Sequence, residues 1–314
     1  MNKILVTALE YDKAADFFRS VPDFQCIRVS GGETELAEAV RREKAEYVIV
    51  GVDRYVSELY EALPCGGVIA RFGVGHDGID SGKAASKGIV CVNTPGVLDD
   101  SVAECAIALM LDAARRIADC SMAVKGGMWR PVRGMELKGK NLAVIGGGHI
   151  GRKVAKIANA GLGMNVLCFD VANCECPYFS SCSQDFAAVV SSADVVSLHL
   201  PLLPSTIGFL NARRISQIRR GAILVNTARG ALVDESALYD ALEQRQLAAA
   251  ALDVFANEPY ISKVPNRDLR RLPNVVMTPH IASSTEDACL SMAKASVDGI
   301  RLVKNGNLGK ASTF

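Results

Sequence analysis

Three stretches of the 314-residue chain contain side chains that can hold a carboxylate and move a proton. Arg229 follows an apolar run, and its planar guanidinium can bind a carboxylate and a carbonyl oxygen together. His280 follows another apolar run and can transfer a proton near neutral pH. Glu258, if it contacts His280, would favour the charged imidazole and fix its tautomer. The three residues are therefore candidates for a site that acts on a small acid.

Each of these residues also has an ordinary explanation. Arg229 could lie at the surface beside a glycine turn, Glu258 could be an acid at a helix start, and His280 a satisfied loop histidine. Their positions after three consecutive strands favour a site, because ligands of parallel α/β sheets bind beyond the carboxyl ends of the strands. No histidines have metal-ligand spacing, and no GxSxG turn predicts a serine hydrolase.

The elements that must position these residues are organised around residues 140–170, KNLAVIGGGHIGRKVAKIANAGLGMNVLCFD, which predict a strand, a glycine turn, a helix and a second strand. Gly146 permits the tight turn, Gly148 lets the backbone approach a pyrophosphate, and Gly151 lets the helix pack on the strand. The helix N-terminus offers unpaired N–H groups to phosphates. Asp170 ends the second strand and can accept both ribose hydroxyls, so NAD is the expected cofactor.

Length and pattern predict two α/β domains. A chain of 314 residues exceeds the size at which one core keeps growing. Apolar runs separated by helical segments predict parallel sheets. The expected strands are 3–7, 47–51, 68–71 and 89–92 in a smaller first domain, and 141–145, 166–169, 194–199, 222–226, 249–253 and 275–277 in a second sheet of about six strands. Helical spacing of apolar residues predicts long helices over 99–120 and 284–303.

Composition excludes several classes of partner. The net charge is +1 and the pI about 7.5, with 49% hydrophobic and 22% charged residues, so no nucleic acid or anionic membrane partner is expected. The first residues lack the pattern of a signal peptide, and no run reaches 18 apolar residues. We therefore expect a cytoplasmic protein.

The ten cysteines predict reduced thiols and no metal centre. Most of them lie within apolar runs, where cysteine behaves as a small hydrophobic residue. Cys174, Cys176 and Cys182 form a group that could hold zinc or an iron–sulfur centre, but the group lacks paired CxxC spacing. What this loop binds, if anything, stays open at this point.

Over nearly its whole length, the chain resembles the D-isomer-specific 2-hydroxyacid dehydrogenases. The motifs that carry the resemblance are RFGVGHDGID (71–80), NTPGVLDDSVAE (93–104), GGGHIG (146–151), HLPLLPST (199–206), VNTARGALVDESAL (225–238), ALDVFANEP (251–259) and LPNVVMTPHIASST (272–285). The resemblance implies two doubly wound parallel-sheet domains, a Rossmann NAD-binding domain and a smaller flavodoxin-like substrate domain. The expected bounds are 1–97 with 285–314 for the substrate domain and 98–284 for the NAD-binding domain, with the active site in the cleft between them.

The resemblance also assigns roles to residues. It implies that Arg229, Glu258 and His280 are catalytic, with His280 as general acid and base. It implies that the backbone N–H groups of Val74 and Gly75 bind the substrate carboxylate. The further implied cofactor contacts are Thr94, His149, Ile150, Leu200, Thr206, Thr227 and Asp253.

The resemblance leaves more than one possibility for the substrate and for the function. NTPGVLDD is similar to glyoxylate/hydroxypyruvate reductases, whereas HLPLLPST and the 71–75 segment are similar to phosphoglycerate dehydrogenases. Arg71, or Arg130 and Arg133, could meet a substrate phosphate or simply be solvated. Homodimers are expected through the region around the connector helix. An NAD(H)-sensing corepressor on the same fold is the alternative to an enzyme, and turnover of hydroxypyruvate with NADH would decide between them.

Overall fold

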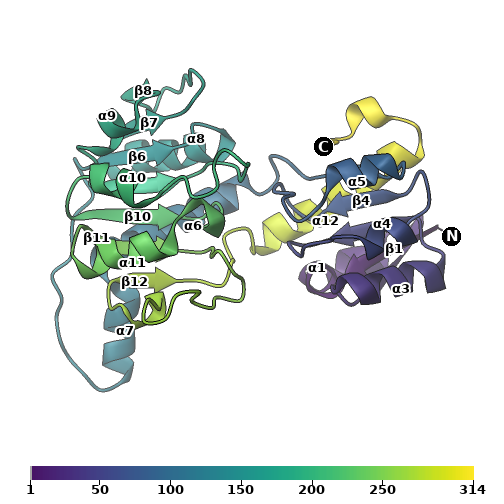
Figure 1. The fold of residues 1–314 in the computed structure, drawn as a ribbon, viewed down its shortest axis with the longest axis horizontal. Helices are drawn as coiled ribbons and strands as arrows, with labels where there is room; N and C mark the ends of the chain where they lie inside the picture. The colour runs from purple at the N-terminus through teal and green to yellow at the C-terminus, as the bar shows by residue number, and fades with distance from the viewer. Residues whose placement is uncertain (1) are drawn as a thin grey trace. The chain divides into compact units, whose positions relative to one another are not determined.

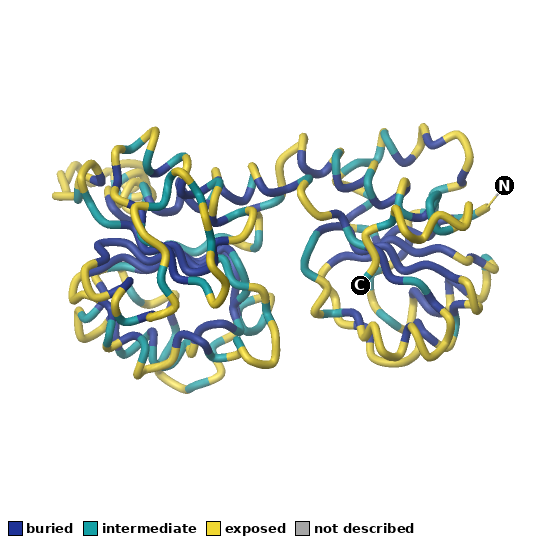
Figure 2. Tube along the Cα trace, turned by 90° about the horizontal axis from the view of Figure 1, so that it is seen from above, coloured by how far each residue is buried: buried dark blue, intermediate teal, exposed yellow. Residues whose placement is uncertain are grey.

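The computed structural model describes residues 2–314, which form two compact units. One unit contains the chain up to Leu98 and again from Ser283 to Phe314, and the other runs from Asp99 to Ala282. Figure 2 shows the strands of each sheet as a buried layer, surrounded by helices that are buried on one side and by largely exposed loops. Among residues 2–314, no helix combines the length and the apolar character needed to cross a membrane.

The first unit is built on a five-stranded sheet in which every strand pair is parallel (Figure 1). Its strands are β1 (Asn2–Thr7), β2 (Phe24–Val29), β3 (Tyr47–Val50), β4 (Val68–Arg71) and β5 (Val90–Val92). Its helices are α1 (Ala8–Lys13), α2 (Ala15–Ser20), α3 (Glu33–Glu43), α4 (Glu58–Ala62), α5 (Ser81–Ser86), α12 (Glu286–Lys304) and the short η4 (Leu308–Lys310). The order β2-β1-β3-β4-β5 is that of a flavodoxin-like doubly wound sheet.

The second unit contains seven parallel strands in the order β12-β11-β10-β9-β6-β7-β8. They are β6 (Asn141–Ile145), β7 (Asn165–Phe169), β8 (Ser181–Ser183), β9 (Val195–Leu198), β10 (Ala222–Asn226), β11 (Leu247–Leu252) and β12 (Val275–Met277). The helices are α6 (Asp99–Arg115), α7 (Ile117–Lys125), α8 (His149–Lys156), α9 (Phe186–Val190), α10 (Ala212–Gln217) and α11 (Glu235–Glu243), with η1 (Ile157–Gly161), η2 (Gly230–Leu232) and η3 (Leu269–Arg271). The strand order reverses between β6 and β9, which is where Rossmann sheets bind dinucleotides.

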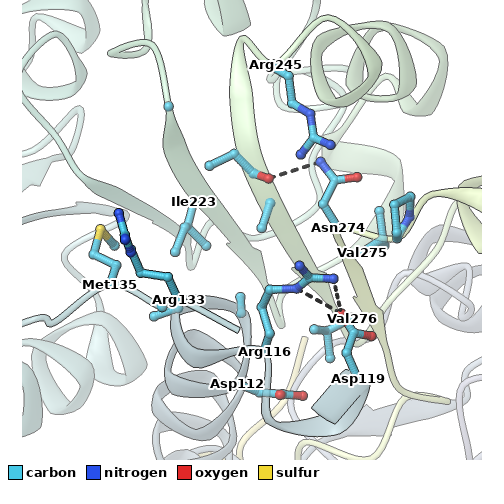
Figure 3. Close-up of a pocket in the computed structure, with 17 residues that line it drawn as sticks. Asp112, Arg116, Asp119, Arg133, Met135, Ile223, Arg245, Asn274, Val275 and Val276 are labelled. Atoms are coloured by element: carbon cyan, nitrogen blue, oxygen red, sulfur yellow. Dashed lines mark hydrogen bonds and ion pairs between the residues drawn. The ribbon is translucent and has the colours of Figure 1, made fainter. Parts of the chain in front are cut away.

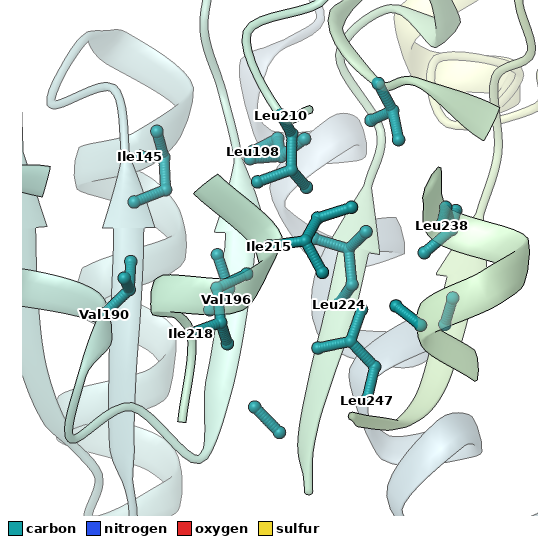
Figure 4. Close-up of a cluster of buried hydrophobic side chains, with 14 of the residues drawn as sticks. Ile145, Val190, Val196, Leu198, Leu210, Ile215, Ile218, Leu224, Leu238 and Leu247 are labelled. Carbon is teal, nitrogen blue, oxygen red and sulfur yellow. The ribbon is translucent and has the colours of Figure 1, made fainter. Parts of the chain in front are cut away.

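Apolar side chains cover both faces of the seven-stranded sheet. On one face, Ile145 and Leu224 of the strands pack in a buried cluster with Leu238 of α11 (Figure 4). On the other face, Met110 of α6 and Val154 of α8 belong to a second cluster. Each fully buried side chain of this size stabilises the fold by about 1.5–3 kcal/mol, so the strands form a rigid base for the loops at their ends.

The long helix expected over residues 99–120 ends earlier, before Arg116. Arg116 has a φ of 55°, a left-handed conformation that ends an α-helix, and α7 begins at the next residue. The Asp112 carboxylate accepts a hydrogen bond from the Ala118 N–H of α7 at 2.8 Å. The chain therefore forms two helices joined by a sharp turn.

Two edge strands lie outside the expected set. The seventh strand of the second sheet, β8, has the sequence Ser-Cys-Ser and no buried residue. In the first sheet, β2 is buried only at its two end residues, Phe24 and Val29. Edge strands pair on one side only and can be polar, so a search for continuous apolar runs finds interior strands and passes over these two.

Candidate active site

The three catalytic candidates follow three neighbouring strands. In the seven-stranded sheet, β10, β11 and β12 are adjacent and parallel, and their last residues are paired in register. The loops that follow therefore begin at the same carboxyl edge of the sheet, where α/β proteins bind their ligands. Arg229, Glu258 and His280 lie on these loops.

His280 and Glu258 form a hydrogen-bonded pair. His280 Nδ1 lies 2.7 Å from Glu258 Oε2, and the two side chains are 26% and 31% exposed. Glu258 Oε1 accepts a hydrogen bond from the Phe255 N–H at 2.9 Å. Burial raises the pKa of Glu258, but the hydrogen bond and charge of His280, the Phe255 N–H and the charge of Arg229 lower that pKa by more. Glu258 is thus a carboxylate at neutral pH, and its contact with Nδ1 leaves the Nε2 atom of His280 for a substrate.

Asp253, which is fully buried, holds the turn that presents His280. Its Oδ1 accepts hydrogen bonds from the Thr278 hydroxyl at 2.6 Å and the Ile281 N–H at 2.8 Å, and its Oδ2 accepts one from the Ala282 N–H at 2.8 Å. The His280 N–H donates to the Asp253 carbonyl at 2.9 Å. These bonds fix both sides of His280, whose φ of 54° is left-handed and rare for a side chain of this kind. A buried carboxylate therefore sets the position of the imidazole.

The Arg229 loop is pressed against the Glu258 loop. The Asn226 side chain donates a hydrogen bond to the Arg229 carbonyl at 3.0 Å and closes the turn after β10. A Cβ atom on Gly230 would lie 1.9 Å from the carbonyl carbon of Phe255, so only glycine allows this approach. The approach brings the Arg229 charge close enough to lower the pKa of Glu258.

The glycine loop after β6 is closed tightly on itself and on Asp170. A Cβ atom on Gly151 would meet the Gly146 carbonyl at 2.1 Å, so α8 can pack this closely on the strand only with glycine there. The Gly147 N–H donates to Asp170 Oδ2 at 2.8 Å, and the Ala172 N–H donates to Asp170 Oδ1 at 2.9 Å. The carboxylate at the end of β7 is therefore fixed beside the loop.

Three features at the carboxyl edge of this sheet fit NAD. α8 begins at His149 and Ile150 without a side-chain cap, so its first N–H groups remain for phosphate oxygens. A Cβ atom on Gly148 would meet nothing within 4 Å, so the helix start faces open space. The buried Thr227 hydroxyl has no hydrogen-bond partner among residues 2–314. An open helix start, an unsatisfied hydroxyl and a fixed carboxylate are what a pyrophosphate and a ribose would engage.

The loop after β9 holds the remaining cofactor candidates of this unit. Leu200 packs against the apolar core. The Thr206 hydroxyl donates to the Pro201 carbonyl at 2.7 Å and accepts from the Leu203 N–H at 2.8 Å, so it shapes the loop itself. Burial lowers the pKa of His199 to about 4, so this imidazole is neutral and cannot act as a proton donor near pH 7.

In the five-stranded unit, the loop of Val74 and Gly75, which is predicted to bind the substrate carboxylate, is held by hydrogen bonds to its carbonyl groups. The buried Arg71 donates from Nε to the Gly75 carbonyl at 2.7 Å, and Asn93 donates to the Val74 carbonyl at 2.9 Å. Within the described chain, no hydrogen bond engages the N–H of Val74 or Gly75, and the buried Thr94 hydroxyl also has no partner. Two such N–H groups can bind an anion. Arg71 shapes this loop, and its contact with a substrate phosphate stays a prediction.

A hollow of about 340 Å³ lies at the opposite, amino-terminal ends of β10, β11 and β12. Ile223 and Val276 line it from the strands, and Arg116 and Arg133 line it from the chain on either side of α7 (Figure 3). A nitrogen of Arg116 lies 3.0 Å from a carboxylate oxygen of Asp119. Arg133 is thus at the edge of the sheet that faces away from His280.

Residues 107–282, more than half of the chain, match the NAD-binding domain of the D-isomer specific 2-hydroxyacid dehydrogenases. The chain belongs to this family. It is 39% identical over 310 residues to the D-3-phosphoglycerate dehydrogenase of Archaeoglobus fulgidus, covering 95% of this chain and 56% of that protein. It is 42% identical over 243 residues to the hydroxypyruvate reductase of Thermotoga maritima, covering 77% and 78%.

Solved structures agree with this family membership. The NADPH-dependent glyoxylate/hydroxypyruvate reductase of Sinorhizobium meliloti, in complex with NADP and malonate, matches with a TM-score of 0.85 and 29% identity over 99% of this chain and 96% of that one. The chain spans 56% and 59% of the length of two curated phosphoglycerate dehydrogenases that it matches.

In this D-2-hydroxyacid dehydrogenase family member, two positioning residues escaped sequence reasoning. Asn226 closes the Arg229 turn, and Asp253, expected only to contact the cofactor, also holds the His280 turn. Both are Asn or Asp residues at the end of a strand, where such side chains commonly bond to nearby backbone groups and form turns. That position was the signal in the sequence.

Proposed function

We propose that this protein is an NAD-dependent D-2-hydroxyacid dehydrogenase, which transfers a hydride between NAD(H) and a small 2-hydroxy or 2-keto acid. The observation that carries the proposal is the 2.7 Å contact between His280 and Glu258, in the same unit as the glycine loop. The relatives named as hydroxypyruvate reductase, glyoxylate reductase and D-3-phosphoglycerate dehydrogenase support the substrate class.

Each residue of the set would have one task. Bound NADH would supply the hydride to C2 of the keto acid. The Nε2 atom of His280 would carry the proton for the substrate oxygen in reduction and take it back in oxidation. Glu258 would hold Nδ1–H and stabilise the charged imidazole. The Arg229 fork would bind the carbonyl oxygen and the carboxylate, and the N–H groups of Val74 and Gly75 would bind that carboxylate as well.

Within this class, we propose a keto acid without a phosphate, hydroxypyruvate or glyoxylate. Arginine is a common ligand of substrate phosphates, but the buried guanidinium of Arg71 already donates to carbonyls of its own loop. Arg133 lies at the amino-terminal edge of the strands, and Arg130 is an exposed residue near it in sequence. The hydrogen bonds of Arg71 and the positions of Arg133 and Arg130 favour the smaller acids over 3-phosphoglycerate.

The test is a panel of hydroxypyruvate, glyoxylate, pyruvate and 3-phosphohydroxypyruvate with NADH and with NADPH. We expect turnover with NADH, and kcat/KM highest for hydroxypyruvate or glyoxylate. A preference for the phosphorylated acid would overturn the substrate proposal. Absence of turnover with all four acids, combined with tight NADH binding, would favour the corepressor-like alternative.

We also propose that the protein is a homodimer, joined through the segment that follows α6. The helix α7 has no buried residue, and Ile117 and Met122 are 57% and 73% exposed. Trp129, in the loop after α7, is 86% exposed. So many large apolar side chains in one segment are typical of an interface. The hollow at the amino-terminal strand ends, lined by both apolar and charged side chains, lies beside this segment.

Sedimentation would test this assembly. We expect the wild type to sediment as a dimer and Met122→Asp as a monomer, because a buried charge without a partner destabilises an interface. Leu9→Asp is the matched control, since Leu9 is 71% exposed but lies in α1. A monomeric wild type, or a Leu9→Asp variant that dissociates equally, would contradict the proposal.

A cytoplasmic location completes the proposal. All ten cysteines are free thiols, and most of them are at least partly buried. A reducing compartment preserves such thiols. Fractionation of the source cells, with immunodetection of the protein, would test the location.

A further inference from the structure

Three thiols gather in β7, in β8 and in the loop between them, close to Asp170. Cys168 lies in β7 and is fully buried, Cys182 lies in β8 and is exposed, and Cys174 lies in the loop between these strands. Cys168 and Cys182 are direct partners in the register of the two parallel strands. Neighbouring strands lie about 4.8 Å apart. That spacing falls within the Cα–Cα range of a disulfide, about 4.4–6.8 Å.

Two of these sulfur atoms pack directly on the glycine loop. A Cβ atom on Gly147 would lie 2.8 Å from Cys174 Sγ and 2.9 Å from Cys168 Sγ, so no space remains between the sulfurs and the loop. The N–H of Gly147 is held by the Asp170 carboxylate at 2.8 Å. The N–H of Asp170 in turn donates to the carbonyl of Ser183, the residue after Cys182, at 3.3 Å. A change at the sulfurs therefore reaches both Gly147 and Asp170.

The thiols differ in how an oxidant can reach them. Burial raises the pKa of Cys168, and the hydrogen bond and charge of Cys182 raise it further. Burial and the charge of Asp170 raise the pKa of Cys174. Both side chains are therefore protonated at neutral pH, and the exposed Cys182 is the thiol that a dissolved oxidant meets first. Within residues 2–314, no three His, Cys, Asp or Glu side chains converge as a metal-ligand set.

We propose that Cys168 and Cys182 form a reversible disulfide that weakens NAD(H) binding. Hydrogen peroxide is the oxidant. It converts the Cys182 thiol to a sulfenic acid as its O–O bond breaks and one water leaves. The Cys168 sulfur then attacks the Cys182 sulfur, the S–S bond forms, the S–O bond breaks, and the hydroxyl leaves as water with the Cys168 proton. Two thiols and one peroxide thus give one disulfide and two waters, and a dithiol reductant reverses the change.

The disulfide acts on the cofactor site because the Cys168 sulfur packs on Gly147, and Ser183, the residue after Cys182, accepts a hydrogen bond from the Asp170 N–H. Drawing the Cys168 sulfur toward β8 removes its contact with Gly147 and moves the backbone of β8, to which Asp170 is hydrogen-bonded. The hydrogen bond between Gly147 and Asp170 is then lost or misaligned. The catalytic loops follow other strands, β10, β11 and β12, so the chemical step is unaffected. This inference rests on the proposed role of the glycine loop and Asp170 in binding the cofactor.

The experiment compares reduced protein with protein treated with a slight excess of hydrogen peroxide. Free thiols are blocked with N-ethylmaleimide, and cross-linked peptides are identified by mass spectrometry. NADH binding is measured by fluorescence titration, which needs no turnover and so separates this inference from a failure of the proposed enzyme activity. We expect a Cys168–Cys182 cross-link and an NADH dissociation constant raised by about fivefold, the effect of losing one hydrogen bond. Dithiothreitol should restore the original value.

Two variants keep the inference falsifiable. Cys182→Ser, at an exposed position, should fold normally, form no cross-link and lose the response to peroxide. Cys65→Ser is the matched control, because Cys65 is also exposed but lies in the other unit, and it should respond as the wild type does. A cross-link through Cys174, a cross-link without weaker NADH binding, or a peroxide response that persists in Cys182→Ser would each overturn the proposal.

Discussion

The two sheets of this protein begin in the same way and differ at the end of their first strand. In the seven-stranded sheet, β6 leads into a glycine loop, and Gly148 faces open space at the start of α8. In the five-stranded sheet, β1 leads directly into α1, whose buried Glu10 accepts a hydrogen bond from the Thr7 hydroxyl. A Cβ atom on Gly51 would lie 2.2 Å from the Glu10 carboxylate. The position that can receive a phosphate in one sheet is thus filled by an acid in the other.

The difference shows which part of a doubly wound sheet carries function. Both sheets are parallel and buried, but the loops at the carboxyl ends of their strands have different chemistry. One sheet has an open helix start, a carboxylate and a His–Glu pair at this edge. The other has the loop of Val74 and Gly75, held by Arg71, and the buried acid Glu10. Function resides in such sites and does not follow from the fold.

The largest effect is expected at His280. His280→Asn should fold as the wild type does, because asparagine tolerates the left-handed φ of 54°. It cannot supply the proton, so kcat for keto-acid reduction should fall by about 10²–10⁴-fold. Steady-state kinetics at saturating NADH would measure this fall, with circular dichroism as the check on folding. A rate near that of the wild type would mean that another residue donates the proton.

How far the sequence alone predicts this molecule can be seen from particular residues. The interior strands and the glycine loop were predictable, because buried apolar runs and GxGxxG patterns are local signals. The strand β8 was not, since its Ser-Cys-Ser sequence has no apolar pattern. The role of Asp253 depends on bonds to residues 278, 281 and 282, and the packing of Gly230 on Phe255 spans 25 residues. Such contacts arise only when the strands assemble.

The next effect concerns the choice of cofactor. Asp170 is fixed beside the glycine loop and should repel the 2′-phosphate of NADPH. We expect kcat/KM with NADH to exceed that with NADPH by about a hundredfold, the consequence of one like-charge contact. Asp170→Ala should narrow this ratio by raising NADPH use and weakening NADH. Asp185→Ala is a control, because Asp185 only caps α9. Equal kcat/KM of the wild type with NADH and NADPH would contradict the assignment of Asp170 as the residue that selects NADH.

A smaller effect is expected from Glu258→Gln. The pKa of Glu258 lies below its ordinary value of 4.5. Above pH 4.5 its carboxylate is therefore charged and stabilises the protonated imidazole of His280, and it loses this charge only at lower pH. Glutamine removes the charge and keeps the shape. The pH at which reduction falls to half its maximum should therefore move about one unit lower, because a charge-assisted hydrogen bond becomes a neutral one. A pH profile of kcat/KM that does not move would show that Glu258 does not support the charged imidazole.

The smallest effect on activity is expected at Glu10. This residue follows the first strand of the five-stranded sheet, at the position that the glycine loop has in the seven-stranded sheet. Glu10→Ala removes one of the two acceptors of the buried Thr7 hydroxyl and leaves the Ile49 carbonyl at 3.4 Å, so the free energy of unfolding should fall by about 1–3 kcal/mol. The KM for NADH should not change, because Glu10 lies in the unit that does not contain the glycine loop. Denaturant unfolding and steady-state kinetics on the same preparation would separate the two effects, with Glu10→Gln as the variant that keeps a hydrogen-bond acceptor. A raised KM for NADH with unchanged stability would mean that both strand ends serve the cofactor, and the contrast between the two sheets would then fail.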